Sequence, residues 1–184
     1  EAHGQADVIL ATNVICHLPN LNDILEGFRV LLKPGGRIIG QDPYFHDVLA
    51  RTSYDQIYDE HVFYFTKRSL ANALRAHGLV LHATSHEEVH GGSLRYVVAH
   101  AGAPEADGDE SLHFSRLELF RDDVLDSRNE LLVKLWNAKE EGRRVVGYGA
   151  TSKSTTVTNF CPIGPDLVET IRDVTPFKQG KLSP

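Results

Sequence analysis

The sequence predicts an α/β protein with two lobes, each built from buried strands that lead into helices. Three observations predict this fold class. A strand–helix–strand pattern opens the chain, one long amphipathic helix follows in its second half, and another strand then turns through glycines into a helix. The 184 residues, 41% of them hydrophobic, are enough for one domain or two small ones.

Composition excludes several classes of protein. A net charge of −6 argues against nucleic acid as the main partner. No apolar run reaches the roughly 18 residues of a transmembrane helix, so we expect no membrane partner. The two cysteines, Cys16 and Cys161, lie far apart, which indicates a reducing, cytoplasmic location and no metal site within this chain. The sequence has no methionine, so we interpret it as an excerpt or a processed piece.

The first lobe begins with a strand–helix–strand unit. Residues 7–14 are a mostly apolar run, typical of a buried parallel strand. Apolar residues recur at helical spacing over 24–32, which predicts a helix. We expect Asn22 or Asp23 to cap its start and Pro34–Gly36 to end it. Residues 37–41 form the second strand, reached by a right-handed crossover. Ligands of such sheets bind beyond the carboxyl ends of the strands. Those ends carry Asn13, His17, Asp42 and Tyr44.

A polar, aromatic insertion follows at about residues 44–65. Its second half, YDQIYDEHVFYF from Tyr54, gathers acidic groups, one histidine and several aromatic rings. Tyr58 and His61 are three residues apart, which predicts one side of a helical turn. A titratable cluster against apolar walls suits acid–base chemistry. An amphipathic turn with a solvated acidic face is the alternative.

The rest of the first lobe is a helix and a hairpin. Thr66 is expected to cap a helix that runs through His77 and ends at a left-handed Gly78. Residues 79–87 and 94–100 then form two antiparallel strands around a glycine turn.

The second lobe follows a polar linker at 103–110. Residues 112–141 predict one long helix that ends at Gly142 and has a single apolar stripe. We interpret the helix as a bridge between two lobes and its stripe as ordinary core packing. A strand at 144–149 then turns through glycines into a helix, a pattern that can bind anions. Lys153 and nearby hydroxyls suit a phosphate, although GYGA lacks the third glycine of the dinucleotide fingerprint. Residues 166–173 predict a second strand or turn.

Five ordered motifs carry a family resemblance. They are DPY at Asp42, YDQIYDEHVFYF at Tyr54, HGGSLR at His90, GYGATSK at Gly147 and PFKQG at Pro176. Together they resemble the S-adenosylmethionine-dependent sugar C-methyltransferases that act on nucleotide-linked 4-keto deoxysugars. The resemblance covers nearly the whole chain.

The resemblance implies a three-part enzyme of which this chain is a portion. Residues 1–102 match the second half of a Rossmann-like methyltransferase core, with the active-site insertion inside it. Residues 103–141 match a linker and long helix, and 142–184 match the start of a second Rossmann-like lobe that binds the nucleotide sugar. S-adenosylmethionine is the implied cofactor, but the glycine-rich loop that holds most of it is absent. Zinc is implied only for an N-terminal lobe that is also absent.

The resemblance also implies roles for particular residues. The implied catalytic residues are His61, Tyr58, Glu60 and His17. Those beside the methyl donor are Asn13, Val14, Ile15 and Cys16, and those near the nucleotide or in its lobe are Lys153, Asn159 and Lys178. A ketone acidifies the neighbouring C–H, so one positioned base can form an enolate that accepts the methyl group. We expect His61 to be that base, placed by Tyr58 and Glu60, and His17 to donate a hydrogen bond to the enolate oxygen. His17 as a turn histidine satisfied by backbone groups is the alternative.

Three rival functions stay open. A nicotinamide oxidoreductase would use the GYGA turn, for which Asp166 is an imperfect ribose partner. A metal hydrolase would use histidines such as His82, His86 and His90. A non-catalytic fragment or interaction module would pair through an exposed sheet edge, the same edge through which we expect a homodimer.

Overall fold

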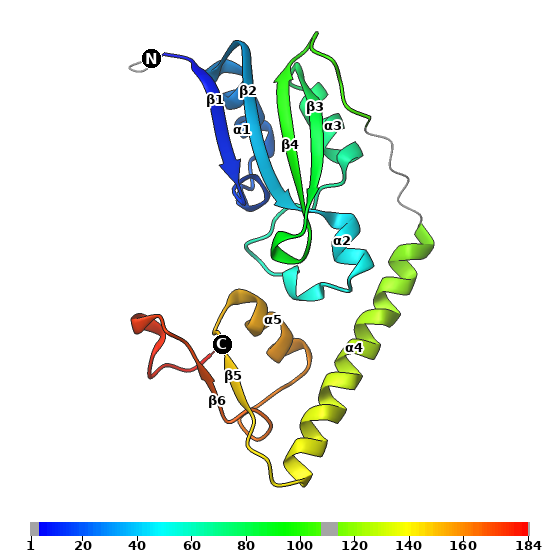
Figure 1. Ribbon diagram of the computed structural model, residues 1–184, viewed down its shortest axis with the longest axis vertical. Helices are drawn as coiled ribbons and strands as arrows, with labels where there is room; N and C mark the ends of the chain where they lie inside the picture. Colours follow the sequence, from blue (N-terminus) through cyan, green and yellow to red (C-terminus); the bar gives the residue numbers. More distant parts are fainter. Residues whose placement is uncertain (1–3, 108–113, 184) are drawn as a thin grey trace. The chain divides into compact units, whose positions relative to one another are not determined.

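The computed structural model describes residues 4–107 and 114–183, which divide into two compact units (Figure 1). Within these residues, unit 1 consists of 4–51 and 59–107, and unit 2 consists of 52–58 and 114–183. The predicted insertion at 44–65 is therefore shared, because its middle segment, Thr52–Tyr58, packs within unit 2.

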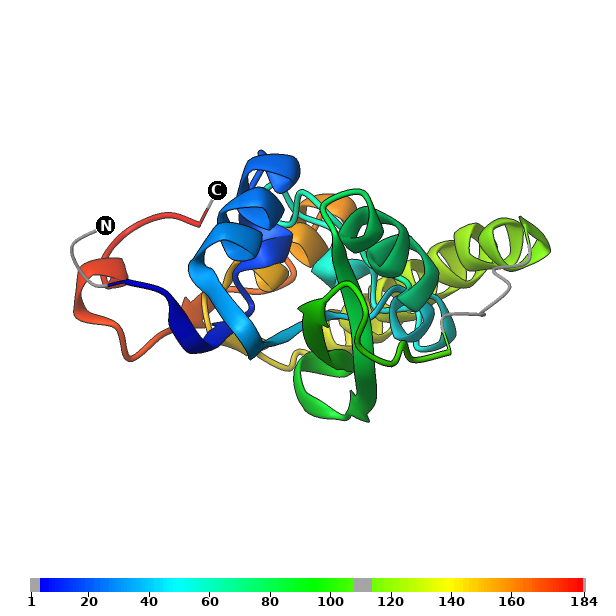
Figure 2. The ribbon, with the colours of Figure 1, turned by 90° about the horizontal axis from the view of Figure 1, so that it is seen from above.

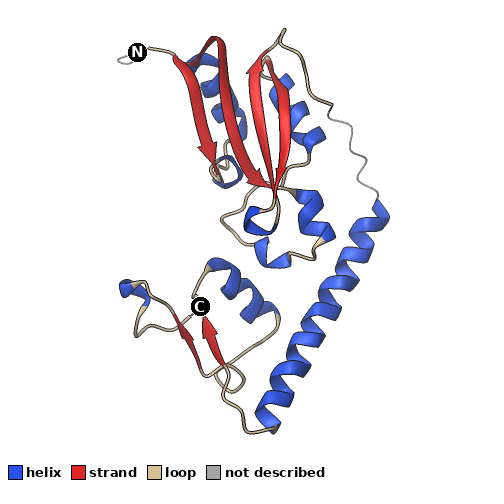
Figure 3. Cartoon of the chain, viewed as in Figure 1, coloured by secondary structure: helices blue, strands red, loops and turns tan. Residues whose placement is uncertain are grey.

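Unit 1 is built on a four-stranded mixed sheet (Figure 3). Its strands are β1 (Ala6–Thr12), β2 (Leu32–Pro43), β3 (Leu79–Glu87) and β4 (Ser93–His100). They lie in the order β1-β2-β4-β3, with β1 parallel to β2 and both other pairs antiparallel. The predicted parallel pair and antiparallel hairpin are confirmed, and β4 enters the sheet between β2 and β3.

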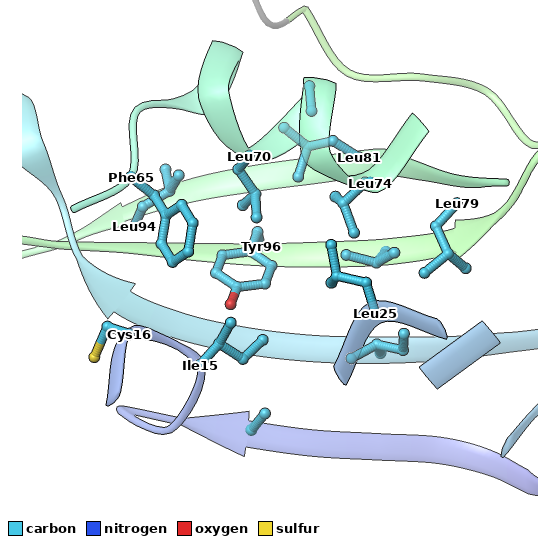
Figure 4. Close-up of a cluster of buried hydrophobic side chains, with 14 of the residues drawn as sticks. Ile15, Cys16, Leu25, Phe65, Leu70, Leu74, Leu79, Leu81, Leu94 and Tyr96 are labelled. Carbon is cyan, nitrogen blue, oxygen red and sulfur yellow. The ribbon is translucent and has the colours of Figure 1, made fainter. Parts of the chain in front are cut away.

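Helices α1 (Leu21–Leu31) and α3 (Lys67–Arg75) cover one face of this sheet, and α2 (Phe45–Ala50) follows β2 (Figure 2). Apolar side chains from both covering helices and from the strands form one buried cluster (Figure 4). The fully buried members include Leu25, Ile38, Leu70, Leu74 and Leu81. The edge strand β1 differs, because Val8 and Leu10 are 53% and 72% exposed. None of the described helices is long and apolar enough to cross a membrane.

Three local predictions for unit 1 are wrong. Helix α1 has Asn20 at its N-cap position without a side-chain capping bond, so neither Asn22 nor Asp23 caps it. The helix ends at Leu31 and β2 begins at once, because the next residue, Leu32, is drawn fully into the core. Pro34–Gly36 thus lie inside the strand, at an irregularity of its register with β1.

The predicted helical turn joining Tyr58 to His61 is the third error. Residues 58–60 form a bend and a turn, and only Tyr54–Gln56 (η2) is a short 3-10 helix. The capping of α3 was predicted correctly: Thr66 Oγ1 accepts the Ser69 amide at 3.0 Å, and Gly78 has φ +67°.

Unit 2 contains the long helix α4 (Phe114–Glu140), β5 (Val146–Tyr148), α5 (Ser152–Phe160) and β6 (Thr170–Arg172). The strands β5 and β6 form a separate two-stranded parallel sheet, and the 3-10 turn η4 (Pro176–Lys178) follows. The long-helix prediction is confirmed over 114–140, with Gly142 at φ +71° after its end. The predicted start at Leu112 and the end of the linker, 108–110, lie outside the described residues.

Candidate active site

The candidate active site lies in unit 1, where β1 and β2 reach their carboxyl ends. After β1 the chain turns sharply at Asn13, which has φ +51° and whose amide donates to the Gln41 carbonyl at 2.7 Å. The 3-10 turn η1 (Ile15–His17) follows, with the side chains of Ile15 and Cys16 buried. The turn therefore presents His17 beside the end of β2.

A buried carboxylate holds this turn in place. Asp42 is only 1% exposed, and its Oδ1 accepts the Cys16 amide at 3.1 Å. Its Oδ2 accepts the Tyr96 hydroxyl at 2.5 Å. Burial raises the pKa of Asp42, although both hydrogen bonds act in the opposite direction. Burial, aided by Asp42, also raises the pKa of the Cys16 thiol, which keeps it protonated.

Gly40 makes the Asp42–Tyr96 bond sterically feasible. Gly40 lies opposite Tyr96 in the β2–β4 ladder, and a Cβ on Gly40 would stand 2.2 Å from the ring of Tyr96. The absence of that Cβ lets the ring lie across β2, with its hydroxyl on Asp42.

Two histidines meet beside the turn. The ring centroids of His17 and His61 are 4.9 Å apart, and His61 is 8% exposed. His17 Nδ1 lies 2.7 Å from the Glu60 carbonyl oxygen. A carbonyl only accepts, so Nδ1 carries a proton and donates it, and the neutral ring keeps its lone pair on Nε2.

Backbone hydrogen bonds attach the end of the insertion to η1. The amides of Val62 and Phe63 both donate to the Cys16 carbonyl, at 2.8 and 3.2 Å. These bonds fix the backbone that carries His61 against the turn that carries His17. Among the residues that the structure describes, Cys16, His17 and His61 are the one group of three metal-ligating side chains whose ligand atoms all lie within 4.8 Å of one another.

The structure therefore brings together the segment Asn13–Cys16, His17 and His61. Glu60 contributes its carbonyl to this group, while its side chain is exposed. Tyr58 belongs to unit 2. Sequence reasoning placed Asp42 at the strand end but missed its bond to Tyr96. The two residues are 54 positions apart, and no local pattern signals the pair.

Unit 2 contains a cavity of about 1090 Å³ beside β5, β6 and the start of α5. The amides at the start of α5 are engaged within the protein: Thr151 and Ser154 form a reciprocal capping box, with bonds of 2.9 and 3.1 Å. The Ala150 amide donates to Asp173 Oδ2 at 2.8 Å. Hydrogen bonds from Thr175 and Ala150 hold the pKa of Asp173 well below its usual range. The predicted anion site is thus partly filled by the protein's own groups.

The three residues predicted for nucleotide binding lie in different surroundings. Lys178 lines the cavity, and its Nζ donates to the Ala150 carbonyl at 2.6 Å. Lys153 and Asn159 lie outside the lining, and Asn159 Nδ2 donates to the Thr155 carbonyl at 2.9 Å. Sequence reasoning missed two further cations in the lining, Arg172 and Lys181, which carry no motif.

The residues that would support the rival functions have other partners. Asp166 Oδ2 lies 3.4 Å from Lys139 Nζ. His82 Nδ1 donates to the Pro104 carbonyl at 2.7 Å, and His86 Nε2 lies 2.6 Å from Asp47 Oδ2. His82 and His86 therefore do not share a ligand site in the described structure.

Comparisons with known proteins also divide the chain into two parts, but they divide it at the β3–β4 hairpin, within unit 1. A model of a methyltransferase domain matches residues 1–84, and a model of the C-methyltransferase C-terminal domain matches residues 88–184, more than half of the chain. The C-methyltransferase NovU from Streptomyces niveus is 28% identical over 194 residues. That match takes in 99% of this chain and 46% of NovU, so the chain spans about half the length of this curated relative.

Similarity to solved structures is partial. The N-methyltransferase NodS from Bradyrhizobium japonicum is 14% identical, with a TM-score of 0.40, over 55% of this chain and 54% of NodS. An O-methyltransferase family protein from Burkholderia thailandensis is 17% identical, with a TM-score of 0.39, over 54% of this chain and 32% of that protein.

Proposed function

The chain belongs to the C-methyltransferase family, and from this premise we propose that it transfers a methyl group from S-adenosylmethionine to carbon. The acceptor is a carbon beside the ketone of a nucleotide-linked 4-keto deoxysugar. One observation carries the proposal: two histidine rings stand 4.9 Å apart at the carboxyl ends of β1 and β2, where ligands of open α/β sheets bind.

His61 removes the proton that the ketone acidifies. An imidazole has an ordinary pKa of about 6.5, so its neutral form is available as a base at neutral pH. Burial of His61 and the two amide bonds from Val62 and Phe63 to Cys16 support this role, because a general base needs a fixed position. Glu60 assists through its carbonyl, which holds the neighbouring ring of His17.

His17 stabilises the enolate oxygen. Because Nδ1–H is directed to the Glu60 carbonyl, His17 donates to a substrate only from Nε2, and therefore only as the imidazolium. A positive charge beside a developing oxyanion lowers the energy of the transition state. The same geometry makes neutral His17 the main rival of His61 as the base, since its Nε2 then carries the lone pair.

The turn Asn13–Cys16 lies beside the bound S-adenosylmethionine, and unit 2 binds the nucleotide sugar. The cavity beside β5 and β6 supports the second assignment, since Lys178, Arg172 and Lys181 supply positive charge for a diphosphate. Lys153 at the start of α5 adds a further cation, and Asn159 contacts the nucleotide. A cytoplasmic location fits the two unpaired, buried cysteines. The exposed edge of β1 pairs with another strand, and a second copy of the protein is our candidate for it.

Solvent deuterium exchange tests the proposal in the complete enzyme. The carbon beside the ketone should acquire deuterium without the methyl donor. His61→Gln should lower exchange and methyl transfer by about 10²-fold or more. Lys153→Ala should weaken sugar-nucleotide binding and preserve exchange at saturating substrate.

His82→Gln is the matched control, because it removes a histidine from β3 that bonds to the Pro104 carbonyl. It should keep the parent exchange rate. Exchange that survives in His61→Gln but disappears in His17→Gln would transfer the role of base to His17. Exchange that survives in both variants would refute the assignment of a histidine base.

A further inference from the structure

The group formed by Cys16, His17 and His61 has the chemistry of a metal site. It offers one cysteine sulfur and two imidazole nitrogens, the ligand types that Zn²⁺ and other thiophilic divalent cations prefer. The Cys16 thiol is protonated in the free protein, so a bound cation replaces that proton, which is released to solvent. We propose that these three side chains bind such a cation, with Zn²⁺ as the leading candidate, and that the bound cation inhibits the enzyme. The inhibitory part rests on the proposed function, whereas the binding part does not.

Distances favour binding without backbone movement. All three ligand atoms lie within 4.8 Å of one another. Bonds of about 2.0–2.3 Å in a tetrahedral zinc site place ligand atoms about 3.3–3.6 Å apart. Small side-chain rotations close this difference. In Figure 4 the Cys16 sulfur points away from the labelled apolar side chains, so it is presented at the margin of the core.

The surroundings of His17 resemble those of a metal ligand. Histidines that bind metals almost always direct their other ring N–H to a carbonyl or carboxylate, which fixes the ring and its tautomer. His17 Nδ1 does this with the Glu60 carbonyl at 2.7 Å. Nε2 is then the nitrogen available to a cation.

The backbone that carries the ligands is already ordered. Asp42 holds the Cys16 amide, and the Cys16 carbonyl accepts from Val62 and Phe63, which follow His61 directly. The three ligands thus come from two segments that hydrogen bonds join to each other. Such preorganisation reduces the entropy that binding would otherwise cost.

Three protein ligands leave one coordination position open for water or a substrate atom. A cation bound here occupies an imidazole nitrogen of both His17 and His61, so neither ring can then remove the substrate proton or donate to the enolate. Zinc and productive substrate should therefore exclude each other.

Cobalt substitution gives a direct test in the complete enzyme. Co²⁺ added to the parent should produce a thiolate-to-cobalt charge-transfer band in the near ultraviolet, with tetrahedral visible bands, and Zn²⁺ should abolish both. Cys161→Ser is the matched control and should keep the signal, because Cys161 is also buried but belongs to unit 2. Cys16→Ser should lose the charge-transfer band, and difference spectra against this variant subtract cobalt bound elsewhere.

His17→Gln and His61→Gln should each weaken cobalt binding by more than about 10-fold while circular dichroism stays unchanged. A charge-transfer band that is missing in the parent, or that persists in Cys16→Ser, overturns the site. If the band behaves as expected but Zn²⁺ leaves methyl transfer unchanged, the inhibitory role and the catalytic roles of the two histidines are refuted, and the metal site stands. If no band forms but methyl transfer still requires His61, the metal site alone fails.

Discussion

The sheets of the two units differ in how completely they are packed. In unit 1, four strands and two covering helices bury a continuous core, including the charged group Asp42. In unit 2, β5 and β6 form only a two-stranded sheet. Tyr148 at the end of β5 is 84% exposed, and Val174 shortly after β6 is 78% exposed. A two-stranded sheet gains little stability by itself. Precise side-chain placement is therefore concentrated in unit 1, and the apolar surface of unit 2 is available to a ligand or a further strand.

The largest contrast should come from truncating an apolar side chain in each unit. Leu25→Ala removes a fully buried side chain of α1 and should lower the free energy of unfolding by about 3–5 kcal/mol. Val174→Ala in unit 2 should change it by less than about 0.5 kcal/mol, because that side chain is exposed. Urea unfolding followed by circular dichroism measures both. Equal losses would contradict the difference in packing between the units.

Gly40→Ala tests the close approach between β2 and Tyr96. The added methyl group meets the ring at 2.2 Å, so we expect a loss of about 3 kcal/mol from overpacking. Gly27→Ala is the matched control, since Gly27 lies within α1 with nothing within 4 Å of its added Cβ. It should stabilise the helix by about 0.5–1 kcal/mol. A Gly40→Ala protein as stable as the parent would show that the ring of Tyr96 moves aside at little cost.

Tyr96→Phe tests the buried carboxylate. Loss of the hydroxyl removes a donor from Asp42, and we expect about 1–2 kcal/mol of destabilisation at neutral pH. The raised pKa of Asp42 gives stability that is fully present below the unfolded value and is lost as pH rises through the folded value. Tyr96→Phe should raise that pKa further and extend the loss of stability to higher pH. Asp42→Asn should remove this pH dependence, which unfolding curves recorded above pH 3.8 would detect.

The smallest effect should come from Tyr54, which anchors the segment Thr52–Tyr58 within unit 2. Its hydroxyl lies 3.4 Å from Cys161 Sγ, and burial raises its pKa to about 12. The unfolded phenol ionises near pH 10, so unit 2 should lose stability as pH rises from about 10 to 12. In Tyr54→Phe, the free energy of unfolding of unit 2 should depend less on pH in this alkaline range. Trp136, the one tryptophan of the 184 residues, lies in α4, so its fluorescence reports on the unfolding of unit 2. An unchanged pH dependence of unfolding in Tyr54→Phe would refute the role of Tyr54.

The sequence by itself determined the elements whose signals are local. The hairpin of β3 and β4 follows from two apolar runs around a glycine turn, and α4 follows from one apolar stripe ended by Gly142. Thr66 caps α3 because its hydroxyl needs only the amide three residues ahead. The position of His17 after the first strand likewise needed no long-range information.

Tertiary structure decided the parts that depend on distant partners. The insertion does not form a helical turn at Tyr58–His61, because its backbone bonds to the Cys16 carbonyl from 46 positions away (62 minus 16). The bond between Asp42 and Tyr96 requires β4 to enter the sheet beside β2, which no local pattern specifies. Thr52–Tyr58 packs with unit 2, although the residues on both sides of it belong to unit 1. The spacing of apolar residues in a sequence indicates which side chains are buried. The hydrogen-bond partner of each buried polar group is determined only when strands distant in the sequence pair.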